Sequence, residues 1–194
     1  RLEIHNLGHA VEQFDADIVC LQEVRAFNRK HARRFQHWPD QGQADFLAPE
    51  GYTPVYRTNA ITKHGEHGNA LLSRWPVLEH RHEDMSDHRL EQRGLLHVTL
   101  QVQAREVHVI VVHLGLLPGS RIRQTQQLHD FIQREVPADA PLLVAGDFND
   151  WGRVVARMMA TVGLHTNAGR PHATYPSRLP LVQLDHVYPR GVHR

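Results

Sequence analysis

Cysteine is almost absent from this chain: Cys20 is the single cysteine among 194 residues. One thiol excludes an internal disulfide framework and any zinc site built on cysteine. No stretch approaches the roughly 18 consecutive apolar residues that a membrane-spanning helix needs. An excess of charge is missing too, because 22 basic and 21 acidic residues give a formal net charge of +1. That balance argues against a general polyanion binder, although the 17 histidines are left out of the count.

Lysine is also scarce, since Lys30 and Lys63 are the only two among the 22 basic residues and the others are arginine. Arginine suits bidentate contacts with phosphate. No repeat, linker or low-complexity tract interrupts the chain, so we predict a single domain over residues 1–194. The single cysteine and the lack of a signal-peptide pattern favour the cytoplasm, but the first residues by themselves assign no compartment.

Short apolar runs alternate with amphipathic stretches along the chain. We expect helices at residues 7–14, 25–36, 120–135 and 151–162. We expect strands at residues 18–21, 52–57, 69–73, 76–80, 94–102, 106–112, 142–145, 173–175 and 183–188. The inward-facing residues are expected to be Leu7, Ala10, Val11 and Phe14 in the first helix, and Ile122, Leu128, Phe131 and Ile132 in the third. Residues 95–102 alternate as a half-exposed strand does. The mixture predicts an α/β protein in which sheets pack on each other and on helices.

Polar residues stand at the ends of four apolar runs. These residues are Glu23 after 18–22, His113 after 109–112, Asp147 and Asn149 after 142–146, and Asp185 with His186 after 182–184. Ligand sites in layered α/β folds tend to lie beyond strand ends. We therefore interpret these residues as one constellation.

Each of these residues also has a purely structural explanation. Glu23 could cap or pair with a basic helix, His113 could be a satisfied core histidine, and Asp185 could orient His186 or simply end a strand. In an extended chain Asp147 and Asn149 share a face while Phe148 points into the core, and Gly146 permits a close approach. A turn is the alternative there, but it does not explain the four buried aliphatic residues before it. Function is therefore favoured for that pair.

With these motifs in order, the chain resembles the endonuclease/exonuclease/phosphatase superfamily, in particular a bacterial subgroup of it. The motifs are Leu21-Gln22-Glu23, Gly68-Asn69-Ala70-Leu71-Leu72-Ser73, Glu91-Gln92-Arg93-Gly94, His113-Leu114-Gly115, Gly146-Asp147-Phe148-Asn149 and Leu184-Asp185-His186. The superfamily contains magnesium-dependent phosphoesterases such as pancreatic-type deoxyribonuclease and neutral sphingomyelinases. The resemblance implies a four-layer α/β/β/α sandwich of two mixed sheets flanked by helices.

The resemblance also implies a role for each matching residue. Glu23 matches the metal-ligating glutamate, Asp147 the aspartate that positions or activates the attacking water, and Asn149 the asparagine that holds the phosphate. His113 matches the histidine that donates to a phosphoryl oxygen, and Asp185 matches the aspartate of the metal and histidine network. Asn69 matches an asparagine near the substrate cleft, with a less defined role.

Two parts of the family pattern are not found in this sequence. The family opens with a strand that carries an asparagine and closes with a Ser-Asp-His strand. Ser86-Asp87-His88 stands mid-chain before an alternating strand, so we interpret it as a coincidental match. His186 directly follows the Asp185 match and is not expected to replace the closing histidine. These departures predict that the 194 residues are a piece of a longer enzyme.

Three further features have a functional and a structural interpretation. The basic stretch Arg25, Arg29, Lys30, Arg33 and Arg34 could attract a phosphate-rich substrate or form a solvated helix face. Arg121, at the start of a predicted helix, is expected to reach a bound anion. His64-Gly65-Glu66-His67 lacks the spacing of zinc hydrolases, so we do not interpret it as a metal site.

The leading hypothesis is a monomeric Mg²⁺-dependent phosphoesterase, with Mn²⁺ able to substitute, that attacks a phosphate ester in line with water. Its substrate would be a nucleic acid, a phospholipid headgroup or a small phosphodiester. The alternative is a catalytically incomplete relative that binds a phosphorylated ligand or nucleic acid without cleaving it.

Overall fold

The computed structural model describes residues 3–26, 42–62, 65–88, 91–150, 154–166 and 183–192. Its helices are α1 (Glu3–Phe14), α3 (Gln43–Leu47), α4 (Pro118–Glu135) and α5 (Val154–Ala160). Its strands are β1 (Ile18–Arg25), β2 (Thr53–Thr62), β3 (Gly65–Ser73), β4 (Val77–Asp84), β5 (Gly94–Val102), β6 (Arg105–His113), β7 (Leu142–Asp147) and β8 (Asp185–Arg190). None of these described helices is both long and apolar enough to cross a membrane.

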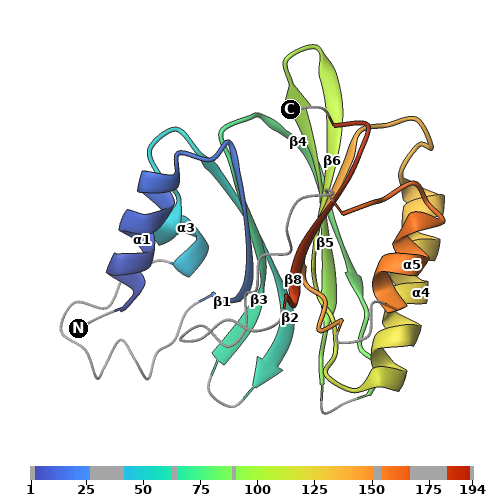
Figure 1. Cartoon of the computed structure of the whole chain (residues 1–194). Helices are drawn as coiled ribbons and strands as arrows, with labels where there is room; N and C mark the ends of the chain where they lie inside the picture. Colours follow the sequence, from blue (N-terminus) through green and yellow to red (C-terminus); the bar gives the residue numbers. More distant parts are fainter. Residues whose placement is uncertain are drawn as a thin grey trace.

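The strands form two sheets that face each other. The smaller has the order β1-β3-β2 and the larger the order β4-β5-β6-β7-β8. Helices α1 and α3 cover the outer side of the smaller sheet, and α4 and α5 cover that of the larger (Figure 1). This is the expected four-layer α/β/β/α sandwich. The larger sheet is mixed, because β6 and β7 run parallel, whereas the described pairs of the smaller sheet are all antiparallel.

Three apolar layers hold the sandwich together. Leu71 of β3 packs on Val98 and Val109 between the two sheets. Outside the smaller sheet, Ile4 and Val11 of α1 pack with Leu47 of α3, Ala70 and Leu72. Outside the larger sheet, α4 and α5 cover a third cluster, which includes Ile110, Val112, Leu128, Phe131, Val144 and Tyr188. Each such side chain contributes roughly 1.5–3 kcal/mol through burial, so the strands are placed by packing on both faces.

Packing of the helices corrects three expectations about exposure. In α1, Leu7 and Phe14 are 46% and 78% exposed, whereas Val11 is buried as predicted, Ala10 is half-buried and Ile4 completes the inward face. In α4, Leu128 and its neighbours face inward as predicted, but Ile122 is 48% exposed. Strand β5 is not half-exposed: its first seven residues are buried. Its polar face is covered because His97 lies edge-on against Phe131 of α4, with ring centroids 5.5 Å apart.

The region after β1 differs from the predicted helix at 25–36. Arg25 is the last residue of β1, and the short helix α3 was not predicted. The remainder of the predicted helix, including Arg29, Lys30, Arg33 and Arg34, lies outside the described residues, as does the predicted strand at 173–175. Of the predicted helix at 151–162, residues 151–153 lie outside the described residues, and the helix is observed as α5, which ends at Ala160.

Candidate active site

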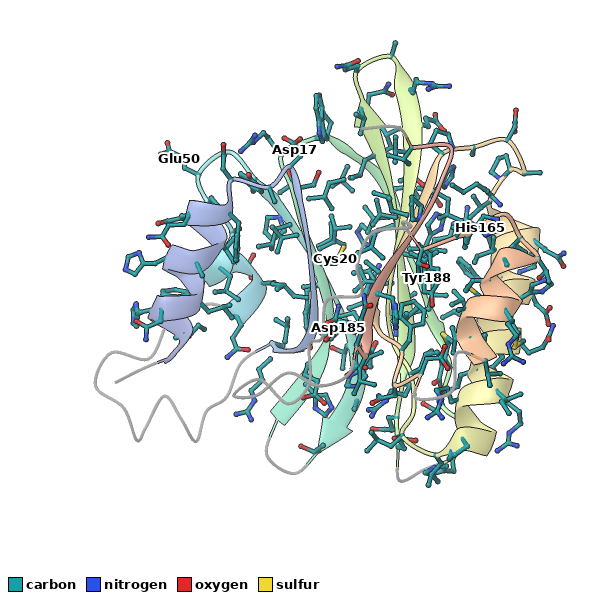
Figure 2. All side chains as sticks on the ribbon, in the orientation of Figure 1. Asp17, Cys20, Glu50, His165, Asp185 and Tyr188 are labelled. Atoms are coloured by element: carbon teal, nitrogen blue, oxygen red, sulfur yellow. The ribbon has the colours of Figure 1, made fainter. Side chains whose placement is uncertain are left out.

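Strand register brings three of the predicted residues together. His113 is paired with Asp147 across the parallel strands β6 and β7, and Asp147 is paired with Asp185 across β7 and β8. Paired residues on neighbouring strands point to the same face of a sheet. Val111, two residues before His113, packs between the two sheets. The row His113, Asp147 and Asp185 therefore lies at one end of the sandwich, on the face that meets the smaller sheet; Figure 2 labels Asp185 at the start of β8.

The smaller sheet contributes Glu23 through an irregularity in β1. The β1–β3 register shifts between Leu21 and Val24, and Glu23 has a φ of 54°. A bulge of this kind bends a strand and re-aims a side chain, and a positive φ in a residue other than glycine is a strained conformation that functional sites often contain. The side chain is 65% exposed, and its Oε1 lies 3.8 Å from Nδ1 of His113. The bulge thus places the Glu23 carboxylate beside His113 of the larger sheet.

His113 lies at the centre of the site. Its side chain is only 12% exposed, and its Nε2 lies 3.8 Å from Oδ2 of Asp147. The pKa of His113 is lowered to about 4, mainly by burial and also by the positive charge of Arg93, whereas the charges of Glu23, Glu91 and Asp185 oppose this shift. A neutral imidazole at pH 7 follows, with one nitrogen that donates and one that accepts.

The carboxyl group of Asp147 has the opposite perturbation. Burial raises its pKa, and the charges of Asp185 and Glu23 raise it too. The backbone N–H of Asn149 and the charge of Arg93 act in the other direction. Carboxylates that crowd one end of the sandwich create a local negative potential, which favours a cation or a proton there. Asp147 is thus a stronger base than an exposed aspartate.

The segment after β7 is a turn rather than the extended chain that we expected. The backbone N–H of Asn149 donates to Oδ1 of Asp147 at 2.9 Å, and Asn149 has a φ of 48°. Phe148 is fully buried, as predicted. Asn149 is 3% exposed, and its Nδ2 donates to the carbonyl of Leu114 at 2.9 Å. The observed turn is therefore compatible with the functional interpretation of this motif, because the turn itself holds the Asp147 carboxylate in place.

Gly146 permits a close approach of two backbones, as its position suggested. It has a φ of 152°, and a Cβ at this residue would lie 1.9 Å from the carbonyl oxygen of Val112. Only glycine fits there without displacing strand β6. The β6–β7 pairing that aligns His113 with Asp147 depends on this contact.

Two residues expected to bind substrate make hydrogen bonds inside the protein. Asn69 has no exposed surface, and its Nδ2 donates to the carbonyls of Gly94 and Val111, which joins β3 to the larger sheet. Arg121 is buried, and its Nη1 donates to the carbonyls of Gly115 and Leu116. These donor groups are directed into the protein, and substrate binding by Asn69 and Arg121 stays a prediction.

Three histidine-containing features were not assigned to the site: Ser86-Asp87-His88, His186 and His64-Gly65-Glu66-His67. Asp87 of Ser86-Asp87-His88 is bound by Arg123 and by Ser120 of α4, both at 2.6 Å, and these contacts hold its pKa well below the usual range. His186 follows Asp185 on β8 and therefore faces the helices, where its ring lies 6.0 Å from that of Phe148. His64 of the third motif, His64-Gly65-Glu66-His67, lies outside the described residues.

Arg93 and Glu91 were not among the residues assigned to the site. The charge of Arg93 acts on both His113 and Asp147, and its side chain is 13% exposed. The signal for it was the β5–β6 hairpin: Leu95 pairs with Val112, so residues just before Leu95 lie beside the end of β6. The strand register, rather than the residue type, would have predicted that Arg93 lies close to His113.

The donor set of the site suits a hard cation. Among the residues that the structure describes, no three His, Cys, Asp or Glu side chains are close enough to form a ready-made metal cage. Mg²⁺, however, is bound in phosphoryl-transfer sites by one or two carboxylates together with water and substrate oxygens. Glu23, Asp147 and Asp185 provide carboxylates at one end of the sandwich. Besides burial, the charges of Asp185 and Glu23 raise the pKa of Asp147, and a cation would relieve that repulsion.

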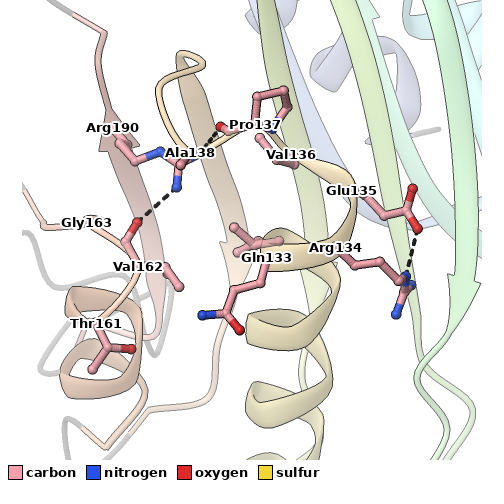
Figure 3. A pocket seen from close by; sticks show the side chains of 11 residues that line it. Gln133, Arg134, Glu135, Val136, Pro137, Ala138, Thr161, Val162, Gly163 and Arg190 are labelled. Atoms are coloured by element: carbon pink, nitrogen blue, oxygen red, sulfur yellow. Dashed lines mark hydrogen bonds and ion pairs between the residues drawn. The ribbon is translucent and has the colours of Figure 1, made fainter.

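A cavity of about 740 Å³ lies at the other end of the larger sheet (Figure 3). Arg190 spans part of its wall, donating to the carbonyls of Val162 and Pro137 at 3.0 Å. Arg190 pairs with Leu142 at the beginning of β7, whereas Asp147 is at its end. The cavity is therefore separate from the cluster around His113.

Comparison with known proteins identifies a matching family, a relative and similar structures. A model of the Endonuclease/Exonuclease/phosphatase family matches residues 2–194. The uncharacterized protein YbhP of Escherichia coli K12 is 38% identical over 196 residues, which cover 97% of this chain and 77% of YbhP. A family protein from Leptotrichia buccalis has a similar structure, with a TM-score of 0.72 at 15% identity, over 96% of this chain and 80% of that one. Sphingomyelinase C from Streptomyces griseocarneus has a TM-score of 0.67 at 22% identity, over 100% of this chain and 79% of that one.

Proposed function

This chain belongs to the Endonuclease/Exonuclease/phosphatase family, and we propose that it is a magnesium-dependent phosphoesterase that hydrolyses a phosphodiester by in-line attack of water. The observation that supports this most directly is the meeting of Glu23, His113, Asp147 and Asp185. They come from four strands of the two sheets and are far apart in sequence. An acid–base pair beside two further carboxylates suits water activation next to an anionic ester.

Asp147 is the proposed base. Its raised pKa makes its carboxylate a better proton acceptor for the attacking water, and the N–H of Asn149 holds one of its oxygens in place. His113 is neutral near pH 7 and can donate a hydrogen bond to a phosphoryl oxygen as negative charge develops there. Arg93 adds positive charge to the same region.

A metal ion would be held by Glu23, with Asp147 and Asp185 close to it. Bound Mg²⁺ would neutralise phosphate charge and stabilise the oxygens of an in-line displacement. The proposal specifies the phosphate ester and not the group that it carries. A nucleic acid, a phospholipid headgroup and a small phosphodiester present the same tetrahedral phosphorus to these residues.

Hydrolysis of bis(p-nitrophenyl) phosphate tests the proposal. We expect Mg²⁺-dependent release of nitrophenol that is abolished by chelation and lowered by about 10³-fold or more in Asp147→Asn. Asp139→Asn is the matched control, because Asp139 is exposed at the other end of β7. A protein that binds inorganic phosphate but hydrolyses no phosphodiester with Mg²⁺ or Mn²⁺ would instead be the catalytically incomplete relative.

A further inference from the structure

The turn after His113 is held by four side chains from three separate segments of the chain. The carbonyl of Leu114 accepts from Asn149, and the N–H of Gly115 donates to Oε1 of Gln124 at 2.7 Å. The N–H of Leu116 donates to Oε1 of Glu91 at 3.0 Å, and Arg121 donates to the carbonyls of Gly115 and Leu116. A surface loop normally satisfies such groups with water. Here they are tied to buried protein groups, so the turn is rigidly placed beside the catalytic histidine.

Glu91 differs from the other three anchors because it also binds Arg93. Its Oε1 accepts from Nη2 of Arg93 at 3.2 Å while accepting from Leu116. The Glu91 and Arg93 side chains are each 13% exposed. A charge-assisted hydrogen bond between two largely buried groups is stronger than an exposed ion pair. One carboxylate oxygen therefore connects the guanidinium whose charge reaches His113 and Asp147 with the backbone that follows His113.

The second oxygen of Glu91 is confined by Gly115. Glu91 Oε2 is buried and has no hydrogen-bond partner among the residues that the structure describes, and His88 Nε2 is 3.7 Å away. A Cβ on residue 115 would lie 2.6 Å from this oxygen and 3.1 Å from Oε1 of Gln124. Glycine at this residue thus leaves room for the carboxylate. The motif His113-Leu114-Gly115 and the motif Glu91-Gln92-Arg93 are two halves of one arrangement.

We propose that Glu91 is a positioning residue of the active site, whose single buried carboxylate fixes both the Arg93 guanidinium and the turn after His113. The catalytic part of this proposal rests on the proposed function. Glu91 acts on the reaction through Arg93 and the turn. It should therefore govern kcat far more than KM, because displacement of catalytic groups by about 1 Å can cost on the order of 10²-fold in rate.

Steady-state kinetics with bis(p-nitrophenyl) phosphate and Mg²⁺ separate this role from general stability. We expect Glu91→Ala to lower kcat by about 10- to 100-fold with little change in KM. Glu91→Gln keeps an acceptor for the N–H of Leu116 but loses the charge opposite Arg93. Its kcat should therefore lie between that of the wild type and that of Glu91→Ala. Glu79→Gln is the control, because Glu79 pairs with Arg81 at the same two-residue spacing on the exposed strand β4. Wild-type kcat in Glu91→Ala would overturn the proposal.

A double-mutant cycle tests the link to Gly115. Gly115→Ala should lower kcat in the wild-type background, because the new Cβ displaces the Glu91 carboxylate. In the Glu91→Ala background the same change should cost much less, since the colliding oxygen is gone. Equal losses in both backgrounds would contradict the proposed coupling.

Amide hydrogen exchange provides a readout that does not depend on activity. Exchange of the Leu116 N–H, followed by NMR under native conditions, should be about 10-fold or more faster in Glu91→Ala and close to wild type in Glu91→Gln. Unchanged exchange in Glu91→Ala would overturn the inference even in an active enzyme. If the wild type hydrolyses no phosphate ester but its exchange pattern responds as expected, the positioning contacts stand and the proposed function fails.

Discussion

Nε2 of His113 lies 3.8 Å from Oδ2 of Asp147, across two parallel strands whose register pairs the same two residues. The separation is longer than a hydrogen bond, so the two side chains are not hydrogen-bonded to each other. Burial affects the two groups in opposite ways: it lowers the pKa of the imidazole and raises that of the carboxyl group. A neutral donor thus stands beside a strengthened base, which is the pairing that hydrolysis by an activated water requires.

Glu23→Gln tests the proposed metal ligand. The amide keeps the size of the side chain and removes its charge, so we expect the Mg²⁺ concentration for half-maximal activity to rise by at least about 10-fold. Titration of activity with Mg²⁺ measures it. Glu106→Gln, at the exposed far end of β6, should leave the titration unchanged. A Glu23→Gln titration that overlays the wild type would remove Glu23 from the metal site.

Asn69→Ala distinguishes a structural role from a substrate contact. The side chain is fully buried and donates to carbonyls of β5 and β6. We expect a loss of about 1–3 kcal/mol in the free energy of unfolding, with KM unchanged for the folded enzyme. Urea denaturation and steady-state kinetics measure the two quantities. An increase in KM at unchanged stability would support the substrate contact that the family resemblance implied.

Gly146→Ala should destabilise the pairing of β6 with β7. Its Cβ would lie 1.9 Å from the carbonyl oxygen of Val112, and its φ of 152° disfavours any other residue. We expect a loss of at least about 1–3 kcal/mol in the free energy of unfolding. Gly119→Ala is the control, because a Cβ there meets only the flexible end of Arg123 at 3.5 Å. Equal thermal stability of the two variants would show that β6 can shift freely.

His97 should make the protein less stable in mild acid. It is 5% exposed, and its Nε2 lies 2.9 Å from Nδ1 of His108. Its pKa is lowered to about 4, mainly by burial and also by the charges of His108 and Arg81, whereas those of Glu79 and Glu135 oppose this shift.

Because the unfolded chain binds this proton near pH ~6.5 and the folded chain only near pH 4, stability is lost as the pH falls between these values. The loss for this one group approaches about 3 kcal/mol. Urea denaturation at pH 7, 6 and 5 should give a shallower decline for His97→Leu than for the wild type. Parallel declines would exclude His97 as a source of the acid sensitivity.

Much of the fold could be predicted from local sequence patterns. Runs such as Leu142-Leu143-Val144-Ala145 are apolar throughout because both of their faces are covered, and the structure confirms the predicted strand and its partner at 106–112. Helix faces were harder to predict. Leu7, Phe14 and Ile122 fit an apolar stripe by spacing, yet they are exposed, because the sheet beneath each helix contacts a narrower stripe than the pattern suggests.

In the candidate site too, some residues could be predicted from local patterns and others could not. Glu23, His113, Asp147 and Asp185 were predicted because each ends an apolar run, and that is a local property. Arg93 and Glu91 end no such run. Their place beside His113 follows from the antiparallel pairing of β5 with β6 and from the contacts of Glu91 with the 114–116 turn. Arg121 was expected to reach a bound anion; its Nη1 donates to the carbonyls of Gly115 and Leu116, contacts that the sequence pattern does not predict.

By itself, the sequence determined where strands end and which chemical groups stand at those ends, because apolar runs and turn residues act over a few neighbours. Only the tertiary structure decided how those groups behave. Burial between two sheets makes His113 neutral and Asp147 more basic. Strand register, a bulge at Glu23 and a glycine at 146 set the distances between them. These properties depend on segments distant in the chain, and no local pattern encodes their separation.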